Sequence, residues 1–133
     1  MEIREYTLFD PDETLGLYAA VGWTNYTRRP DMLEEAYRNS LCALAAYEDG
    51  RLVGIIRAVG DGCSIVFIQD LIVLPEYRRR GIGTGLLRGI MEKYKSAYQM
   101  ELLTDSTDQA RAFYRSAGFR PTEEIGCVSF IRM

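Results

Sequence analysis

The apolar run SIVFIQDLIVLP, residues 64–75, constrains the fold more than any other feature of the sequence. It is apolar for nearly its whole length, which is typical of a central strand that is buried on both faces and ends at Pro75. The turn RRRGIGTG at 78–85 and a helix with apolar residues at helical spacing follow, and then the strand AYQMELLT. The sequence therefore predicts one right-handed strand-helix-strand crossover over about residues 64–104. Its glycine turn lies at the carboxyl end of the first strand, where ligands preferentially bind.

The rest of the chain predicts an α+β fold with a mixed central sheet. The expected order along the chain is β-α-α-β-β-β-α-β-α-β, antiparallel at first. Asp49-Gly50 is a strong hairpin signal between two apolar strands. The other segments are, in order, an opening strand MEIREYTL, helices in TLGLYAAVGW and MLEEAYRNS, a helix in STDQARAFYRSAGF and a final strand EIGCVSFIRM.

Length and composition exclude several function classes. The 133 residues suggest one domain, 1–133, and a net charge of -3 argues against general binding to nucleic acid. The sequence shows neither a signal peptide nor a membrane span, and its three scattered cysteines fit a cytoplasmic protein with reduced thiols. The absence of histidine argues against a metal site and excludes a Ser-His-Asp or Cys-His catalytic device.

The glycine turn predicts a diphosphate site at the start of a helix. Helix N-termini carry unpaired N–H groups and partial positive charge, and glycines let the backbone approach a ligand closely. A P-loop is rejected because no lysine stands in the required place. A dinucleotide fingerprint fits poorly because Leu86 replaces its third glycine, but it stays open as an alternative. A tight turn without a ligand, and a solvated position for at least one arginine, are the alternatives.

Two segments together resemble a known family. Arg78–Gly83 fits the pattern R/Q-x-x-G-x-G/A, and TDSTDQARAFYRSAGF follows at the expected separation. The chain thereby resembles the GNAT superfamily of N-acetyltransferases along essentially its whole length. The resemblance implies a splayed central strand pair and acetyl-CoA as co-substrate. The implied coenzyme-binding residues are Leu71, Ile72, Val73, Arg78, Arg79, Arg80, Gly81, Ile82, Gly83, Thr84, Thr107 and Tyr114. Thr107 stands where the family usually has asparagine.

Two residues are candidates for the acid–base chemistry of acetyl transfer. By resemblance, Tyr114 is the acid that protonates the departing thiolate, although an aromatic core residue is the alternative. Asp70 interrupts an apolar strand, where an unpaired charge is costly. It is either a bulge residue or the partner of an arginine, or else it faces the incoming amine and acts as a base through water.

The acceptor is expected to be a small primary amine. Trp23 and Tyr26 lie in the segment that borders the acceptor pocket in the family, and together with Asp70 they are the candidate substrate residues. Their alternative role is packing on the sheet. The pattern VGW-x-x-Y is similar to a subgroup that includes plant and bacterial serotonin-type acetyltransferases. A peptide N-terminal or lysine acetyltransferase and a CoA-binding module without turnover stay open, and exposed sheet edges would allow a homodimer.

Overall fold

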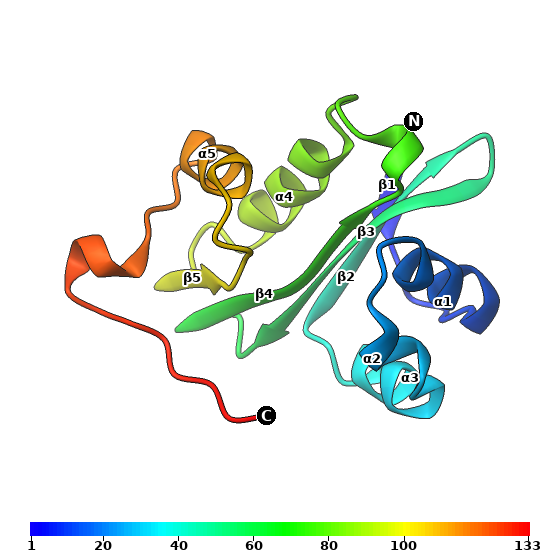
Figure 1. Cartoon of the computed structure of the whole chain (residues 1–133), viewed down its shortest axis with the longest axis horizontal. Coiled ribbons are helices and arrows are strands. Elements are labelled where there is room, and N and C mark those ends of the chain that lie inside the picture. Colours follow the sequence, from blue (N-terminus) through cyan, green and yellow to red (C-terminus); the bar gives the residue numbers. More distant parts are fainter. The chain divides into compact units, whose positions relative to one another are not determined.

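The computed structural model describes all residues from 1 to 133 and contains a mixed sheet of five strands (Figure 1). The strands lie side by side in chain order. The first three pairs of neighbours are antiparallel, and the last pair is parallel. They are β1 (Glu2–Glu5), β2 (Cys42–Glu48), β3 (Arg51–Gly60), β4 (Ile65–Val73) and β5 (Gln99–Leu102). The α+β class and the parallel crossover are thus confirmed. The chain divides into two compact units, Met1–Leu103 and Thr104–Met133, which are described separately.

In the first unit, helices cover both faces of the sheet (Figure 1). α1 (Pro11–Ala20), α2 (Thr24–Thr27) and α3 (Pro30–Arg38) lie on one face, and α4 (Ile82–Lys93) lies on the other. α1 begins where the Asp10 carboxylate accepts hydrogen bonds from the backbone N–H groups of Asp12 and Glu13, at 3.0 and 3.3 Å. α2 is a short helix that the sequence did not predict. No helix of the chain is both long enough and apolar enough to span a membrane.

The buried centre of the sheet consists of β2 and β3. They are joined at Asp49-Gly50, where both residues have positive φ angles, 49° and 78°, as the predicted hairpin requires. The expectation of complete burial on both faces was wrong for β4, in which only alternate residues such as Val66 and Ile68 are fully buried. The physical reason is that successive residues of a strand point to opposite faces, and only the face that carries Val66, Ile68 and Ile72 is completely covered, whereas the opposite face is partly exposed.

Two glycines bring α4 close to the sheet. A Cβ atom at Gly85 would lie 2.9 Å from Cδ1 of Ile3, and one at Gly89 would lie 2.7 Å from Cδ1 of Leu44. Both distances are shorter than ordinary carbon contacts. These glycines of the RRRGIGTGLLRG segment therefore serve helix–sheet packing, which fixes the position of the α4 N-terminus relative to the end of β4.

The second unit contains α5 (Asp108–Ser116) and the 3-10 helix η2 (Thr122–Ile125). The hydroxyl of Thr107 caps α5 by accepting a hydrogen bond from the Ala110 backbone N–H at 3.1 Å. The predicted final strand was wrong: residues 127–133 are in no strand, and the last backbone hydrogen bond of the chain is from Cys127 N to Thr122 O, at 2.9 Å. The segment lacks the neighbouring strand that would complete a ladder, and apolar pattern alone does not supply one.

Candidate active site

The turn between β4 and α4 presents a row of free backbone N–H groups. The 3-10 helix η1 (Pro75–Tyr77) leads into it, and Arg79 and Gly81 then adopt left-handed conformations with φ of 64° and 81°. The backbone N–H groups of residues 79–84 donate to no acceptor in the protein, and the α4 N-cap, Gly81, has no side-chain cap. Such conformations next to a helix N-terminus form concave anion-binding sites. The geometry is that of a site for phosphate groups.

The side chains around this turn differ in their exposure to solvent. Ile82 is 2% exposed and anchors the turn in the core, so only its backbone can contact a ligand. The three arginines, 78–80, are exposed and form no ion pair, but the Arg80 guanidinium lies 4.9 Å from the centre of the Tyr77 ring. Thr84 is exposed. A ligand anion would therefore meet free positive charge beside free N–H groups.

The second half of β4 is open along one side. Its parallel pairing with β5 ends at Ile68 and Leu102, and the pairing with β3 is irregular at the same place, where Gln69 forms a bulge. Beyond the bulge, β4 continues to Val73 with β3 as its only neighbour. The bulge residue is therefore Gln69, next to Asp70. The strand pair β4–β5 parts at this point, which is the splayed pair that the sequence resemblance implied.

Hydrogen-bond alternation shows which residues face the open side. The Leu74 N–H donates to the Val53 carbonyl of β3 at 2.8 Å. In an antiparallel ladder the main-chain groups of alternate residues point to opposite sides, so Ile72 faces β3. Leu71 and Val73 then direct their N–H and C=O groups to the open side, and the Ile72 side chain, 2% exposed, belongs to the core.

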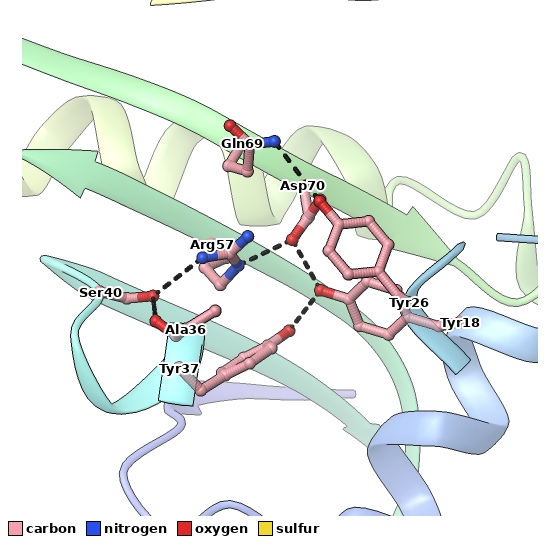
Figure 2. Close-up of polar contacts among 8 residues, drawn as sticks. All are labelled: Tyr18, Tyr26, Ala36, Tyr37, Ser40, Arg57, Gln69 and Asp70. Atoms are coloured by element: carbon pink, nitrogen blue, oxygen red, sulfur yellow. Dashed lines mark hydrogen bonds and ion pairs between the residues drawn. The ribbon is translucent and has the colours of Figure 1, made fainter. Parts of the chain in front are cut away.

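A buried polar network joins β4 to the helices on one face of the sheet (Figure 2). The Asp70 Oδ2 atom accepts hydrogen bonds from Arg57 Nε and from the Tyr18 hydroxyl, each at 2.7 Å. Because the single Tyr18 hydroxyl proton is used in this bond, the Tyr37 hydroxyl donates to Tyr18, at 2.8 Å. Arg57 Nη1 also donates to Ser40 Oγ at 3.3 Å.

The network is deeply buried. Asp70 is 2% exposed and Arg57 is 4% exposed. Burial and the neighbouring Tyr37 and Asp70 raise the pKa of Tyr18 far above its ordinary value, and burial likewise raises the pKa of Tyr37. Burial would lower the pKa of Arg57, but the adjacent Asp70 carboxylate offsets this, so that the pKa is raised. This geometry corresponds to the arginine-partner alternative for Asp70, whose other oxygen, Oδ1, has no partner in the protein.

The two aromatic candidates of the acceptor site lie next to this network. The Tyr18 ring is 5.9 Å from that of Trp23 and 5.1 Å from that of Tyr26, measured between ring centres. Trp23 and Tyr26 are partly exposed, and Gln69 Nε2 donates to the Tyr26 hydroxyl at 3.4 Å (Figure 2). Tyr18 therefore connects the aromatic pair to Asp70. Packing and an accessible aromatic surface, which the sequence left as alternatives, coexist here.

Thr107 and Tyr114 belong to the second unit. Tyr114 lies on α5 between Phe113 and Phe119, with ring centres 4.9 and 6.1 Å away. Burial raises the pKa of its phenol, and a hydrogen bond with the Thr104 side chain opposes this effect. Tyr114 therefore keeps its proton at neutral pH. The capping bond of Thr107 uses its hydroxyl oxygen as an acceptor, which leaves the hydroxyl proton free to donate.

Sequence reasoning missed Arg57, Tyr18 and Tyr37. Arg57 offered a signal, because it interrupts the apolar segment LVGIIRAVG as Asp70 interrupts the next strand. Two opposite charges in adjacent predicted strands of a hairpin suggest an ion pair. The two tyrosines carry no comparable signal, since tyrosines are common in amphipathic helices.

Comparisons with known proteins agree with this geometry. The sequence profile described as the acetyltransferase (GNAT) family matches residues 5–119. A GNAT family acetyltransferase from Streptococcus pneumoniae TIGR4 has a similar structure, with a TM-score of 0.91, 42% identity, and coverage of 99% of this chain and 96% of that chain. Glucosamine 6-phosphate N-acetyltransferase of Trypanosoma brucei brucei is 32% identical over 80 residues, which is 56% of this chain and 54% of that protein.

A further structure shows the same fold at lower identity. It is the aminoglycoside N-acetyltransferase AAC(6')-Iy in complex with CoA, with a TM-score of 0.77, 22% identity, and coverage of 99% of this chain and 93% of that chain. The chain spans about half the length of the curated relatives that it matches.

Proposed function

Because the chain belongs to the acetyltransferase (GNAT) family, we propose that it transfers an acetyl group from acetyl-CoA directly to the primary amine of a small molecule. One observation carries this proposal: the free N–H groups of residues 79–84 directly follow a strand whose main chain is open at Leu71 and Val73. A coenzyme with a diphosphate and an amide-bearing arm needs both features in this order. The fit is supported by AAC(6')-Iy, which has the same fold and was solved with CoA.

The proposed roles in coenzyme binding follow from the hydrogen-bonding groups and charges that have no partner within the protein. The N–H groups of 79–84 bind the diphosphate oxygens, and Arg78 and Arg79 add charge that no carboxylate neutralises. The main-chain groups of Leu71 and Val73 bind the amides of the pantetheine arm. The Val73 N–H is also our candidate for polarising the acetyl carbonyl.

For the chemical step, the neutral amine nitrogen bonds to the acetyl carbon, and the carbon–sulfur bond breaks. An alkylamine has a pKa of about 10, so it must first lose a proton. We assign this proton to water held by Asp70, whose Oδ1 atom has no protein partner. Tyr114 donates a proton to the departing thiolate, for which its protonated phenol is suited.

The acceptor proposal rests on Trp23 and Tyr26. Their partly exposed rings suit a cationic or aromatic amine. Amino sugars are the acceptors that the names of two relatives indicate, glucosamine 6-phosphate and an aminoglycoside. Membership of the serotonin-type subgroup stays a prediction. A panel of amino sugars, tryptamine, polyamines and peptides would rank these classes by kcat/KM.

Calorimetric titration with acetyl-CoA tests the proposal, with NAD and ATP as control ligands. We expect acetyl-CoA to bind and NAD and ATP not to. Gly83→Val should weaken binding about 10- to 100-fold, since a branched side chain would displace one or two charge-assisted hydrogen bonds. The backbone at Gly83 has no positive φ, so the fold should be kept. Gly16→Val is the matched control, because a Cβ atom at Gly16, on α1, would meet nothing within 4 Å and the residue is not part of the turn. Equal binding of NAD, or no binding of acetyl-CoA, contradicts the proposal.

Tyr114→Phe tests the acid. We expect kcat to fall by about 10²-fold or more, with little change in acetyl-CoA affinity, because the ring is kept and only the proton donor is lost. In the native protein, activity should persist until the pH exceeds the raised pKa of Tyr114. Unchanged kcat in the variant would return Tyr114 to a packing role.

A further inference from the structure

Two donors converge on one oxygen of the Asp70 carboxylate (Figure 2). Arg57 Nε and the Tyr18 hydroxyl both donate to Oδ2, each at 2.7 Å, whereas Oδ1 accepts no hydrogen bond from the protein. No completely buried side-chain nitrogen or oxygen lacks a partner. Although Asp70 is only 2% exposed, its Oδ1 atom therefore keeps contact with solvent. This oxygen is available to a water molecule.

The ion pair between Arg57 and Asp70 is not bidentate. A guanidinium can bind both oxygens of a carboxylate with two parallel N–H bonds, and this is the stronger arrangement. Here Nε of Arg57 binds Oδ2, Nη1 donates to Ser40 Oγ at 3.3 Å, and Nη2 donates to no atom of the protein. A second nitrogen is thus free to bind Asp70 and does not. Another contact must keep the carboxylate out of the bidentate arrangement.

The Tyr18 hydroxyl, the second donor to Oδ2, is held rigidly. Tyr18 is completely buried on α1, and its ring centre lies 5.1 Å from that of Tyr26. The Tyr37 hydroxyl of α3 donates to Tyr18 at 2.8 Å, which leaves the proton of Tyr18 for Asp70. Burial raises the pKa of Tyr18 far above its ordinary value, so this phenol stays a donor.

We propose that Tyr18 is a positioning residue, whose hydroxyl holds the Asp70 carboxylate in the orientation that leaves Oδ1 free for the water that receives the amine proton. This inference rests on the proposed acetyl transfer. Without the bond from Tyr18, the carboxylate can rotate until both of its oxygens bind the Arg57 guanidinium, and no oxygen then remains for water. Because the Tyr18 ring also lies against Trp23 and Tyr26, α1 holds the base and the candidate acceptor residues in one arrangement.

Tyr18→Phe tests this proposal, because it keeps the ring and removes only the donor. With tryptamine as acceptor at neutral pH, we expect kcat/KM to fall about 10- to 100-fold, which is less than the full contribution of a general base. The affinity for acetyl-CoA, measured by calorimetry, should stay native, since Tyr18 is not among the proposed coenzyme contacts. Tyr37→Phe is the matched control. It removes a hydroxyl from the same network but leaves the bond from Tyr18 to Asp70, so kcat/KM should fall much less.

The pH dependence of kcat/KM separates positioning from a structural role. The titratable side chains around Asp70 come from each element packed against it: Tyr18 from α1, Tyr26 from α2, Tyr37 from α3 and Arg57 from β3. Without a positioned base, only amine that is already neutral reacts. The activity of Tyr18→Phe should therefore rise about tenfold per pH unit towards the amine pKa of about 10 and approach that of the native protein.

A second acceptor gives the same distinction at one pH. Neighbouring oxygens lower the pKa of the amine in glucosamine, so more of it is neutral and the defect of Tyr18→Phe should be smaller than with tryptamine. A merely structural role would lower kcat/KM equally at every pH and for both amines.

The outcomes separate this proposal from the proposed function. Equal kcat/KM in the native protein and Tyr18→Phe, or a loss that does not depend on pH, overturns the role of Tyr18 and leaves acetyl transfer intact. If the native protein acetylates no amine of the panel, the proposed function fails and this role fails with it. A crystal structure of the native protein is a test that needs no variant: we expect an ordered water bonded to Oδ1, and a bidentate pair between Asp70 and Arg57 would overturn the proposal.

Discussion

The two halves of β4 have similar apolar sequences but different surroundings. Residues Val66–Ile68 pair with β3 on one side and β5 on the other, whereas Asp70–Val73 pair with β3 alone. The change occurs at the bulge, where Asp70 also turns its carboxylate towards Arg57 and Tyr18. The candidate site therefore forms where β4 stops pairing with β5. The first half of the strand holds the sheet together, and the second half keeps main-chain groups available.

The largest effect is expected from removing Asp70, whose ion pair with Arg57 fixes the second half of β4. Asp70→Ala would leave the Arg57 guanidinium buried without a counter-charge, and we expect a loss of about 3–5 kcal/mol in the free energy of unfolding. Urea or guanidinium denaturation measures this loss. The double variant Asp70→Leu with Arg57→Met is the control and should recover most of it, because apolar side chains replace both charges. A loss below about 1 kcal/mol in Asp70→Ala would show that the pair does not hold this part of the strand.

Proline substitutions at two adjacent residues of β4 distinguish the side that bonds to β3 from the side that faces no strand. Ile72→Pro removes an N–H that bonds to β3, and we expect a loss of stability of about 3 kcal/mol or more. Val73→Pro removes an N–H on the open side, where an edge-like position tolerates proline. This variant should be nearly as stable as the native protein, but its KM for acetyl-CoA should rise about tenfold, the cost of one hydrogen bond of about 1.4 kcal/mol.

Val73→Ala is the matched control for the second variant, because it shortens the side chain and keeps the N–H. Its KM for acetyl-CoA should stay close to the native value. If Val73→Pro and Val73→Ala bind the coenzyme equally, the main chain of Val73 is not a coenzyme contact.

A smaller effect separates the two roles of Asp70. Asp70→Asn keeps the shape of the side chain and can still accept a hydrogen bond from Tyr18. If Asp70 holds the water that takes the amine proton, the variant should reach its activity only at higher pH, where more of the amine is already neutral. The pH dependence of kcat/KM measures this change. An unchanged profile with normal stability would leave Asp70 as an anchor only.

The sequence was sufficient for features that depend on local chemistry. The hairpin at Asp49-Gly50, the helix after Gly81 and the crossover to β5 each follow from residues close together in the chain. Family resemblance added the splayed strand pair. The positions of Thr107 and Tyr114 relative to the turn stay predictions.

Features that depend on distant partners were not accessible from the sequence. The bond from Tyr18 to Asp70 joins residues 52 positions apart, and it requires the register of β3 and β4 together with the position of α1. The final segment shows the converse error. Its strand-like composition predicted a strand, but a strand also needs a neighbour, and composition alone does not supply one.

Hydrogen exchange with and without acetyl-CoA tests the central claim most directly. We expect the coenzyme to slow exchange at Leu71, Val73 and residues 79–84, while exchange at the doubly paired residues, Val66–Ile68, stays unchanged. If acetyl-CoA binds without slowing exchange at Leu71, Val73 and residues 79–84, these groups are not the coenzyme site. The loss of pairing between β4 and β5 would then have another function.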